Sequence, residues 1–237
     1  MHGFVCLLRS SLRYVVCLCA LFLVTGLYLA LHSSPADYRQ GEVVRIMYLH
    51  VPAAWISLVA YSAIAGLSLF ALVKKDSIFP QMLSRSMAPV GACYTAVCLV
   101  AGSVWGRHTW GTWWVWDARL TSVLLLFFLY LGYASLWNVY GDQYRAARAS
   151  SLFAVFSAIN VPIVKFSVDI WSTLHQTSSI MRKSGIAIDV SMLIPLITMF
   201  VGLFLLFGVF TVIRVNTLLM RQQIKKQQTS YYYEEGK

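Results

Sequence analysis

Six continuous apolar stretches constrain the fold of this chain more than any other feature of its sequence. A helix needs about 20 apolar residues to cross the hydrocarbon core of a bilayer, and membrane strands would instead appear as alternating segments of about ten residues. Only 12% of the residues are charged, roughly half the fraction of a soluble domain. The sequence therefore predicts an all-α integral membrane protein, a single six-span domain over 1–237, with spans near 12–31, 46–73, 86–104, 120–139, 151–168 and 191–213.

The first stretch follows Arg9 and Arg13, and a basic start before an apolar run is also typical of a secretory signal peptide. The apolar run over 14–31 is longer than a signal core of about 7–15 residues, and no small-residue cleavage motif follows it cleanly. We therefore expect a retained membrane helix.

The basic residues predict the orientation of the six spans. Twelve of the 19 Lys and Arg residues fall on the side that holds both termini, and seven fall on the other side. Since basic residues concentrate on the cytoplasmic side, both termini are predicted to be cytoplasmic, and the longer connections, near 32–45, 105–119 and 169–190, face outward. The net charge of +10 then reflects topology and gives no case for nucleic-acid binding. The sequence has no Walker-type phosphate loop, so we do not expect ATP hydrolysis by this chain.

Five cysteines lie in or near the apolar stretches, and none falls in an outer connection. The sequence contains neither C-x-x-C nor C-x-x-C-H, the motifs of thiol–disulfide exchange and of covalent c-type haem attachment. We exclude both roles and predict buried structural thiols.

The second outer connection contains W-G-R-H-T-W-G-T-W-W-V-W-D-A-R-L-T, with five tryptophans between residues 105 and 116. An interfacial aromatic belt accounts for one or two tryptophans at a helix end, but not for five. If 110–117 is helical, Trp110, Trp113, Trp114 and Asp117 share one face, while Trp105 and Trp116 lie off it. Such a segment would lie flat on the membrane as an amphipathic helix.

Histidines accumulate on the same outer side of the membrane. The second span, 28 residues or roughly 42 Å of helix, is longer than the bilayer core, which places His50 at its outward end with Pro52 in the first helical turn. His175 falls in the third outer connection, and His32 and His108 are also outside. A single interfacial histidine is usually just a satisfied polar residue, but several around one aromatic surface suggest a ligand site.

The ligand that best suits this face is large, flat and apolar. A small metal ion would usually draw on carboxylates near the histidines, and Asp169 and Asp189 are six and fourteen residues from His175. Haem needs axial nitrogens and a wide aromatic surface, and its iron is commonly held by histidine. Its propionates would pair with cations, and the candidates among those on the outer side are Arg45, Arg107, Arg119, Arg182 and Lys183.

The motif W-G-T-W-W-V-W-D-A-R-L-T resembles the tryptophan-rich WWD signature of the haem-handling protein family of cytochrome c maturation. The segments Y-L-H-V-P-A-A-W and T-L-H-Q on either side look like the histidine segments of its six-span branch, the cytochrome c maturation protein C (CcmC) family. The resemblance extends in order over nearly the whole chain. The tryptophan motif is strongly specific, whereas either histidine segment alone would not be.

The resemblance implies that His50 and His175 are the two axial ligands of a haem b. It implies that the connection Trp105–Arg119 forms a platform between them, with the motif residues Trp110, Gly111, Trp113, Trp114, Trp116 and Asp117. It also implies a bacterial inner-membrane protein that presents haem on its periplasmic face to a membrane-anchored haem chaperone. The ABC-type complex beside it would contribute its ATPase and membrane subunits as separate chains. His32 and His108 receive no role, and no enzymatic activity is expected.

Two other classes of protein compete with haem delivery. An integral b-type electron-transfer cytochrome would bury paired histidines inside its helices, whereas these histidines lie near the surface. A transporter, including the membrane subunit of a haem transporter, would place ionisable groups around a cavity at the midplane. Only Asn160, Pro162 and Lys165 in the fifth span hint at that arrangement.

Overall fold

The computed structural model describes residues 2–74, 78–175, 185 and 187–235 of the chain. Every named element within these ranges is a helix. In chain order they are α1 (His2–Tyr28), the π-helical turn η1 (Leu29–Ser33), the 3-10 turn η2 (Glu42–Ile46), α2 (Met47–Val73), α3 (Ile78–Trp110), α4 (Ala118–Val139), α5 (Gln143–Ser157), α6 (Asn160–Ile170) and α7 (Val190–Glu235).

Six helical segments among the described residues are long and apolar enough to cross a membrane, which confirms the predicted all-α architecture and number of spans. The predicted bounds were too short for the third segment, which runs over Ile78–Trp110 rather than 86–104. Hydropathy locates only the apolar part of a helix, and α3 continues through polar turns at both ends. The tryptophan-rich connection is therefore shorter than the 105–119 predicted for it, because Trp105–Trp110 belongs to α3.

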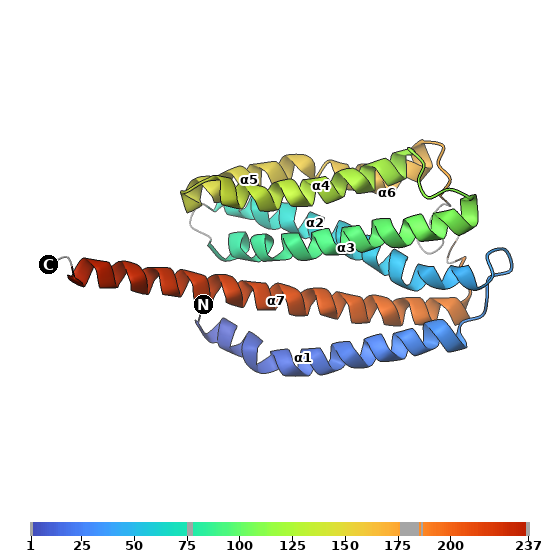
Figure 1. Ribbon diagram of the computed structural model, residues 1–237, viewed down its shortest axis with the longest axis horizontal. Coiled ribbons are helices and arrows are strands. Elements are labelled where there is room, and N and C mark those ends of the chain that lie inside the picture. Colours follow the sequence, from blue (N-terminus) through green and yellow to red (C-terminus); the bar gives the residue numbers. More distant parts are fainter. Residues whose placement is uncertain (1, 75–77, 176–184, 186, 236–237) are drawn as a thin grey trace.

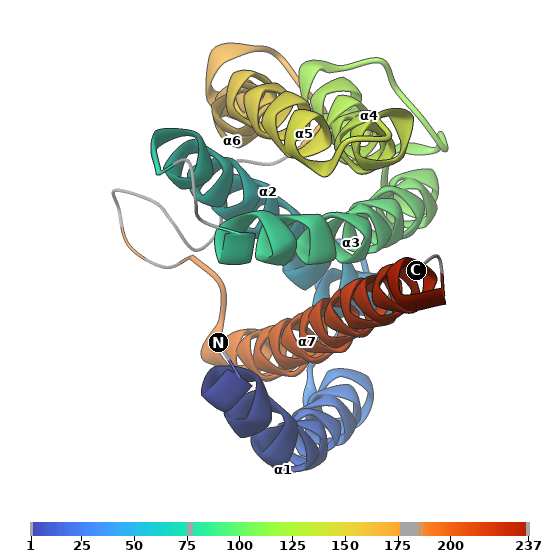
Figure 2. The same cartoon turned by 90° about the vertical axis from the view of Figure 1, so that its left-hand side faces the viewer.

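The helices stack in successive layers (Figures 1 and 2). The outermost helix α1 packs against α7, and α7 packs in turn against α2 and α3. On the far side, α4 contacts α3, and α5 contacts both α2 and α4. The central pair α2 and α3 thus lies between α7 and the α4–α6 group, and its buried surface forms most of the apolar core.

The fifth span is two helices rather than one. α5 ends at Ser157 and α6 begins at Asn160, and Pro162 has no N–H to continue the helical hydrogen bonds across the break. Neighbouring helices satisfy polar groups there: the Tyr61 hydroxyl lies 2.6 Å from Ser157 Oγ, and Asn160 Nδ2 donates to the Ser122 carbonyl at 2.9 Å. Such compensation lets a membrane helix be interrupted.

The last helix continues well past the predicted span of 191–213. α7 contains 46 residues, which corresponds to roughly 69 Å of helix. Its membrane-compatible part is Val190–Lys225, and the helix continues beyond it as far as Glu235. Figure 1 shows this extension projecting beyond the other helices.

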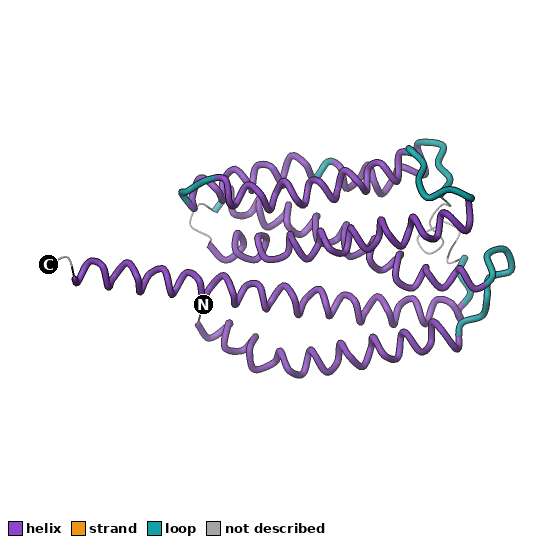
Figure 3. The backbone as a smooth tube through the Cα atoms, viewed as in Figure 1, coloured by secondary structure: helices purple, strands orange, loops and turns teal. Residues whose placement is uncertain are grey.

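Both termini lie at one end of the bundle, and the longer connections lie at the opposite end (Figures 1 and 3). We call that opposite end the Trp end. There α1, α3 and α6 finish and α2, α4 and α7 begin. The sequence between α3 and α4 and the residues that follow α6 therefore meet at the Trp end.

The thiols only partly follow their prediction. Cys19 and Cys98 are buried, as expected, whereas Cys17 and Cys93 are exposed on the outer surface of their helices. In a membrane-spanning bundle, an apolar side chain can face lipid at no cost, so residence in a span does not require burial in protein.

Candidate functional site

The tryptophan segment is divided between the end of α3 and an extended connection. Gly111 follows the last residue of α3 with a φ of 77°, the left-handed conformation with which glycine commonly ends a helix. Asp117 then starts α4 by accepting a hydrogen bond from the backbone N–H of Leu120 at 2.8 Å. We call residues 111–117 the tryptophan connection.

The helix considered over 110–117 does not form. Only Trp110 of this range is helical, and the tryptophan connection is irregular. It folds back onto α3, because Ser103 Oγ donates to the Trp113 carbonyl at 2.7 Å. In consequence Trp113 and Trp116 are exposed, at 57% and 75%, whereas the ring of Trp114 is partly buried and packs edge-on against Trp116 at 5.5 Å.

His50 is held between α2 and α3. It is the fourth residue of α2, and its Nδ1 lies 2.9 Å from the backbone carbonyl oxygen of Cys98. A carbonyl oxygen only accepts, so Nδ1 carries the proton and the lone pair of the imidazole is on Nε2. Pro52 lies in the second turn of α2 rather than the first, because the helix begins at Met47.

Gly102 makes room for the His50 ring. A Cβ at this position would lie 2.7 Å from His50 Cε1 and 3.1 Å from Nδ1. Gly102 is one turn beyond Cys98 on α3, so the ring rests on helical backbone that lacks a side chain at this point. The Cys98 carbonyl and the Gly102 surface together form what we call the His50 seat.

Trp105 covers the edge of the His50 seat. Its ring meets that of His50 edge-on, with centroids 5.7 Å apart. The indole N–H donates to Gln40 Oε1 at 2.8 Å, which ties the end of α3 to the first connection at the Trp end. Trp105 therefore contacts a histidine directly, although it was expected to lie off the helix face shared by Trp110 and Asp117.

His175 lies in a different environment, five residues beyond the end of α6. Its Nδ1 is 3.6 Å from Asp117 Oδ2, and its ring meets Trp110 edge-on at 4.8 Å between centroids. The Asp117 side chain is only 6% exposed. We call the arrangement of Asp117 and Trp110 around this ring the His175 seat.

The electrostatics of the His175 seat keep its imidazole neutral. Burial lowers the pKa of His175 to about 4, and positive charge on Arg119 and His50 acts in the same direction, while the Asp117 carboxylate opposes them. A neutral imidazole offers a lone pair for metal binding at physiological pH.

The predicted propionate-binding cations are mostly engaged within the protein. Arg45 bonds to Glu42 and to the Ala30 carbonyl, which ties the turn η2 to the turn η1. Arg107 bonds to the carbonyl of Gly111. Arg182 and Lys183 lie outside the described residues.

Arg119 fastens α4 to α6. Its Nε donates to Ser167 Oγ at 3.1 Å, and its Nη2 donates to the carbonyls of Val164 and Lys165 at 3.4 Å. Because α6 leads directly to His175, this guanidinium fixes the start of the loop that carries the histidine. Its position explains why its charge reaches His175 without a direct bond to it.

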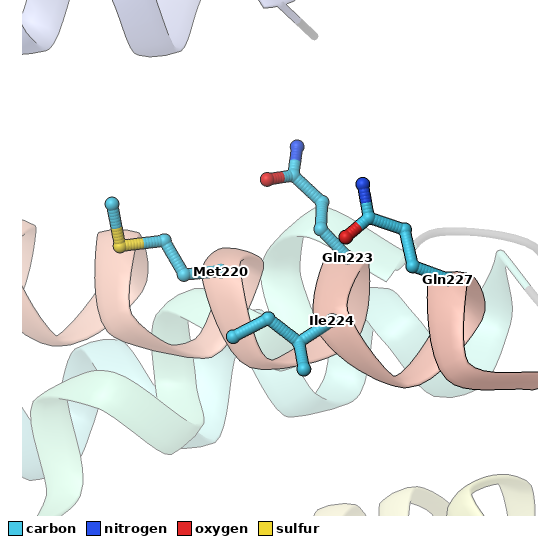
Figure 4. Close-up of a pocket in the computed structure, with 4 residues that line it drawn as sticks. All are labelled: Met220, Gln223, Ile224 and Gln227. Atoms are coloured by element: carbon cyan, nitrogen blue, oxygen red, sulfur yellow. The ribbon is translucent and has the colours of Figure 1, made fainter.

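The remaining candidates lie away from the two seats. His108 is exposed on the last turn of α3, and His32 is exposed with its ring against Tyr28 at 5.2 Å. An open hollow on the extension of α7 is lined by Met220, Gln223, Ile224 and Gln227 (Figure 4). It contains no metal-binding nitrogen and no carboxylate, so it does not compete with the Trp end as the candidate site.

Comparison with known proteins finds relatives that match this chain over most of its length. A family model described as Heme exporter protein C matches residues 2–230. Heme exporter protein C of Bradyrhizobium diazoefficiens is 41% identical over 225 residues, which are 95% of this chain and 85% of that protein. A putative cytochrome c biosynthesis ccmC-like mitochondrial protein of Marchantia polymorpha is 42% identical over 217 residues, 92% of each chain. Heme exporter protein C of Escherichia coli (strain K12) is 42% identical over 193 residues, 81% of this chain and 77% of that protein.

Proposed function

The chain belongs to the Heme exporter protein C family, and we propose that it binds haem b non-covalently at the Trp end and delivers it for cytochrome c maturation. In this proposal His50 and His175 are the axial ligands of the iron, and haem is cargo. The names of two relatives support the two parts of the proposal: one names haem export and the other names cytochrome c biosynthesis.

One observation supports this ligand pair above the others. His50 and His175 come from distant parts of the chain, yet both reach the Trp end with Nδ1 directed at a hydrogen-bond acceptor, the Cys98 carbonyl in one case and Asp117 in the other. Metal-binding histidines usually direct their second nitrogen at such an acceptor, which leaves Nε2 for the metal. His32 and His108 are exposed and have neither arrangement.

The tryptophans would supply the apolar surface that haem needs. Trp105 and Trp110 each contact one of the two histidines, and Trp113 and Trp116 of the tryptophan connection have large exposed rings. Exposed aromatic area of this size is typical of a binding surface rather than of a packed core. We assign Trp113 and Trp116 to the face where haem is presented to its acceptor.

The membrane orientation follows from the basic residues. With twelve of the 19 Lys and Arg residues on the side of the termini, the positive-inside rule places the termini in the cytoplasm and the Trp end in the periplasm. A membrane-anchored haem chaperone would then receive the haem at the Trp end. ATP hydrolysis would be supplied by the ABC-type complex of the same system through separate ATPase and membrane subunits.

The positions of the histidines favour delivery over electron transfer between redox partners. His50 lies in the first turn of α2, and His175 lies beyond the end of α6. A haem held between them sits at the surface of the bundle rather than at its centre. Such a site suits hand-over to another protein, whereas an electron-transfer cytochrome retains its haem.

The test is haem content of the full chain purified in detergent. We expect the wild type to carry a b-type haem with a Soret band, and His50→Ala and His175→Ala to lose most of it and to stop delivery to the chaperone. His108→Ala is the matched control, because His108 is also a histidine at the Trp end but is exposed. Free imidazole should partly restore the spectrum of His50→Gly and His175→Gly by replacing the missing ligand.

The ligand assignment is wrong if both alanine variants keep the haem content, spectrum and delivery of the wild type. Loss of haem from His108→Ala alone would move the site to the exposed end of α3. Turnover with a quinol, in the absence of a haem acceptor, would favour the electron-transfer class.

A further inference from the structure

We propose that Asp117 is a positioning residue for haem ligation, which holds His175 through Nδ1 while it caps α4 with its other oxygen. The inference rests on the proposed function, because it concerns how one of the two proposed ligands is oriented. In this inference the Asp117 carboxylate contacts His175 and does not contact the haem.

The two oxygens of Asp117 have separate partners. Oδ1 accepts a hydrogen bond from the Leu120 N–H at 2.8 Å and so caps α4. Oδ2 takes no part in the cap and points at His175 Nδ1, 3.6 Å away. One side chain therefore links the start of α4 to the loop that follows α6.

Both atoms of this contact are buried and have no hydrogen-bond partner. A buried polar atom without a partner costs about 1–3 kcal/mol, so two such atoms that face each other are poised to form a bond. A movement of about half an ångström would bring Nδ1 and Oδ2 to an ordinary hydrogen-bond distance. Ligation of Nε2, which fixes the ring, would select that closer position.

The chemistry of the pair determines which nitrogen binds iron. An ionised carboxylate only accepts, so the hydrogen bond requires the proton on Nδ1 and leaves the lone pair on Nε2. A carboxylate partner also makes the imidazole a stronger donor to the metal. The expected consequence is tighter binding of ferric haem and a lower midpoint potential than with an uncharged partner.

The cap alone does not account for this arrangement, and the chain supplies a comparison. Asp142 caps α5 with both oxygens, which accept from the N–H groups of Tyr144 and Arg145 at 3.2 and 3.1 Å. Its side chain is 55% exposed. Asp117 caps with one oxygen, is almost completely buried, and directs the second oxygen at a histidine.

Two substitutions separate the cap from the contact with His175. Asp117→Ser keeps a good helix cap and removes Oδ2. Asp117→Asn also keeps the cap but can place an amide donor against Nδ1, which favours the proton on Nε2 and blocks ligation. Asp142→Ser is the matched control for a change of cap.

The full-length variants are purified in detergent, titrated with hemin, and followed by absorption spectroscopy and redox titration. We expect the affinity for hemin to fall by about ten- to hundredfold in both Asp117 variants, more in Asp117→Asn. We also expect the midpoint potential of the haem that remains in Asp117→Ser to shift upward. Asp142→Ser should change neither quantity.

A double-mutant cycle excludes a general folding defect. If Asp117 acts through His175, Asp117→Ser has no further effect on hemin affinity in a His175→Ala background, whereas independent effects would add. Additive losses would overturn the inference. The inference would also be overturned if Asp117→Ser and Asp117→Asn kept the hemin affinity and midpoint potential of the wild type while His175→Ala lost haem. If His175→Ala itself keeps wild-type haem, the assignment of His175 as a ligand fails first.

Discussion

The His50 seat and the His175 seat hold two histidines in different ways. The His50 ring is fixed between two long helices, by a backbone carbonyl and the bare surface of Gly102. The His175 ring lies in a loop, against the side chains of Asp117 and Trp110. The first histidine is thus positioned by the packing of the bundle, and the second by a few replaceable side chains.

This difference suits a protein that must both hold haem and release it. A ligand fixed by the packing of α2 on α3 moves only if the helices move, whereas a ligand in a loop is displaced by changes in its immediate neighbours. We therefore expect His50 to retain the iron longer than His175 during transfer. The comparison also predicts that the two seats respond to different kinds of substitution.

The largest effect is expected from Gly102→Ala, which fills the His50 seat. The added Cβ would lie 2.7 Å from His50 Cε1, so the ring must shift, and we expect this shift to break its bond to the Cys98 carbonyl. We expect the haem content of the purified variant to fall to that of His50→Ala. Absorption spectroscopy and haem quantification measure the loss.

Gly66→Ala is the matched control for that substitution. Gly66 is also in a membrane-spanning helix, and a Cβ there would meet no atom within 4 Å. This variant should keep full haem content and unfold at the same temperature as the wild type or slightly above it. Wild-type haem in Gly102→Ala would show that the His50 seat is not needed for binding.

A smaller effect is expected from Arg119→Lys, which acts on the His175 seat. Lysine keeps the positive charge but not the planar group that reaches Ser167 and the α6 carbonyls. Hydrogen bonds from a charged group contribute about 1.5–3 kcal/mol, so we expect about a tenfold loss of hemin affinity as α6 loosens. If the charge serves a propionate instead, Arg119→Lys should bind hemin nearly as well as the wild type, and Arg119→Gln should not.

The spans could be predicted from sequence because hydropathy is a local property that needs no knowledge of packing. The break between Ser157 and Asn160 is less visible, since it depends on partners such as Tyr61 in a neighbouring helix. The irregular structure of 111–117 did have a signal in the sequence. Gly111 and Asp117 are typical helix-ending and helix-starting residues, and both argue against a helix over 110–117.

The site was only partly accessible from the sequence. The tryptophans and histidines are recognisable by residue type and spacing, and the assignment of His50 and His175 as ligands stays a prediction. The His50 seat could not be predicted, because a backbone carbonyl and a glycine are not recognisable as parts of a site from the sequence. They become neighbours of His50 only when α2 packs on α3. The cations were assigned to propionates by charge alone, yet Arg45 and Arg119 are occupied by carbonyl oxygens.

A modest pH effect should distinguish the His175 seat in the haem-free protein. The folded protein holds the pKa of His175 at about 4, below the ordinary value of 6.5, so the unfolded chain binds more protons in this interval. The stability that His175 contributes is complete above pH 6.5 and is lost as the pH falls toward 4. At pH 5 the loss is about 2 kcal/mol.

Thermal unfolding of the haem-free protein in detergent, from pH 7.5 to 5, measures this loss. His175→Gln has no imidazole at this position, so its melting temperature should fall less than that of the wild type over the same interval. Parallel curves for the two proteins would show that burial does not suppress protonation of His175.

The smallest effect is expected from Cys98→Ala, and it completes the comparison between the two seats. The thiol lies 3.9 Å from His50 Nδ1, but the hydrogen bond of the ring is to the carbonyl oxygen of the same residue at 2.9 Å. Replacement of the side chain leaves that carbonyl in place, so hemin affinity should change by less than about twofold, or roughly 0.4 kcal/mol. Cys98→Ser should behave in the same way, with the same absorption spectrum. A tenfold loss in both variants would mean that the thiol itself holds His50. Both histidines would then depend on a side chain, and the contrast between a ligand positioned by the backbone and one positioned by Asp117 would no longer hold.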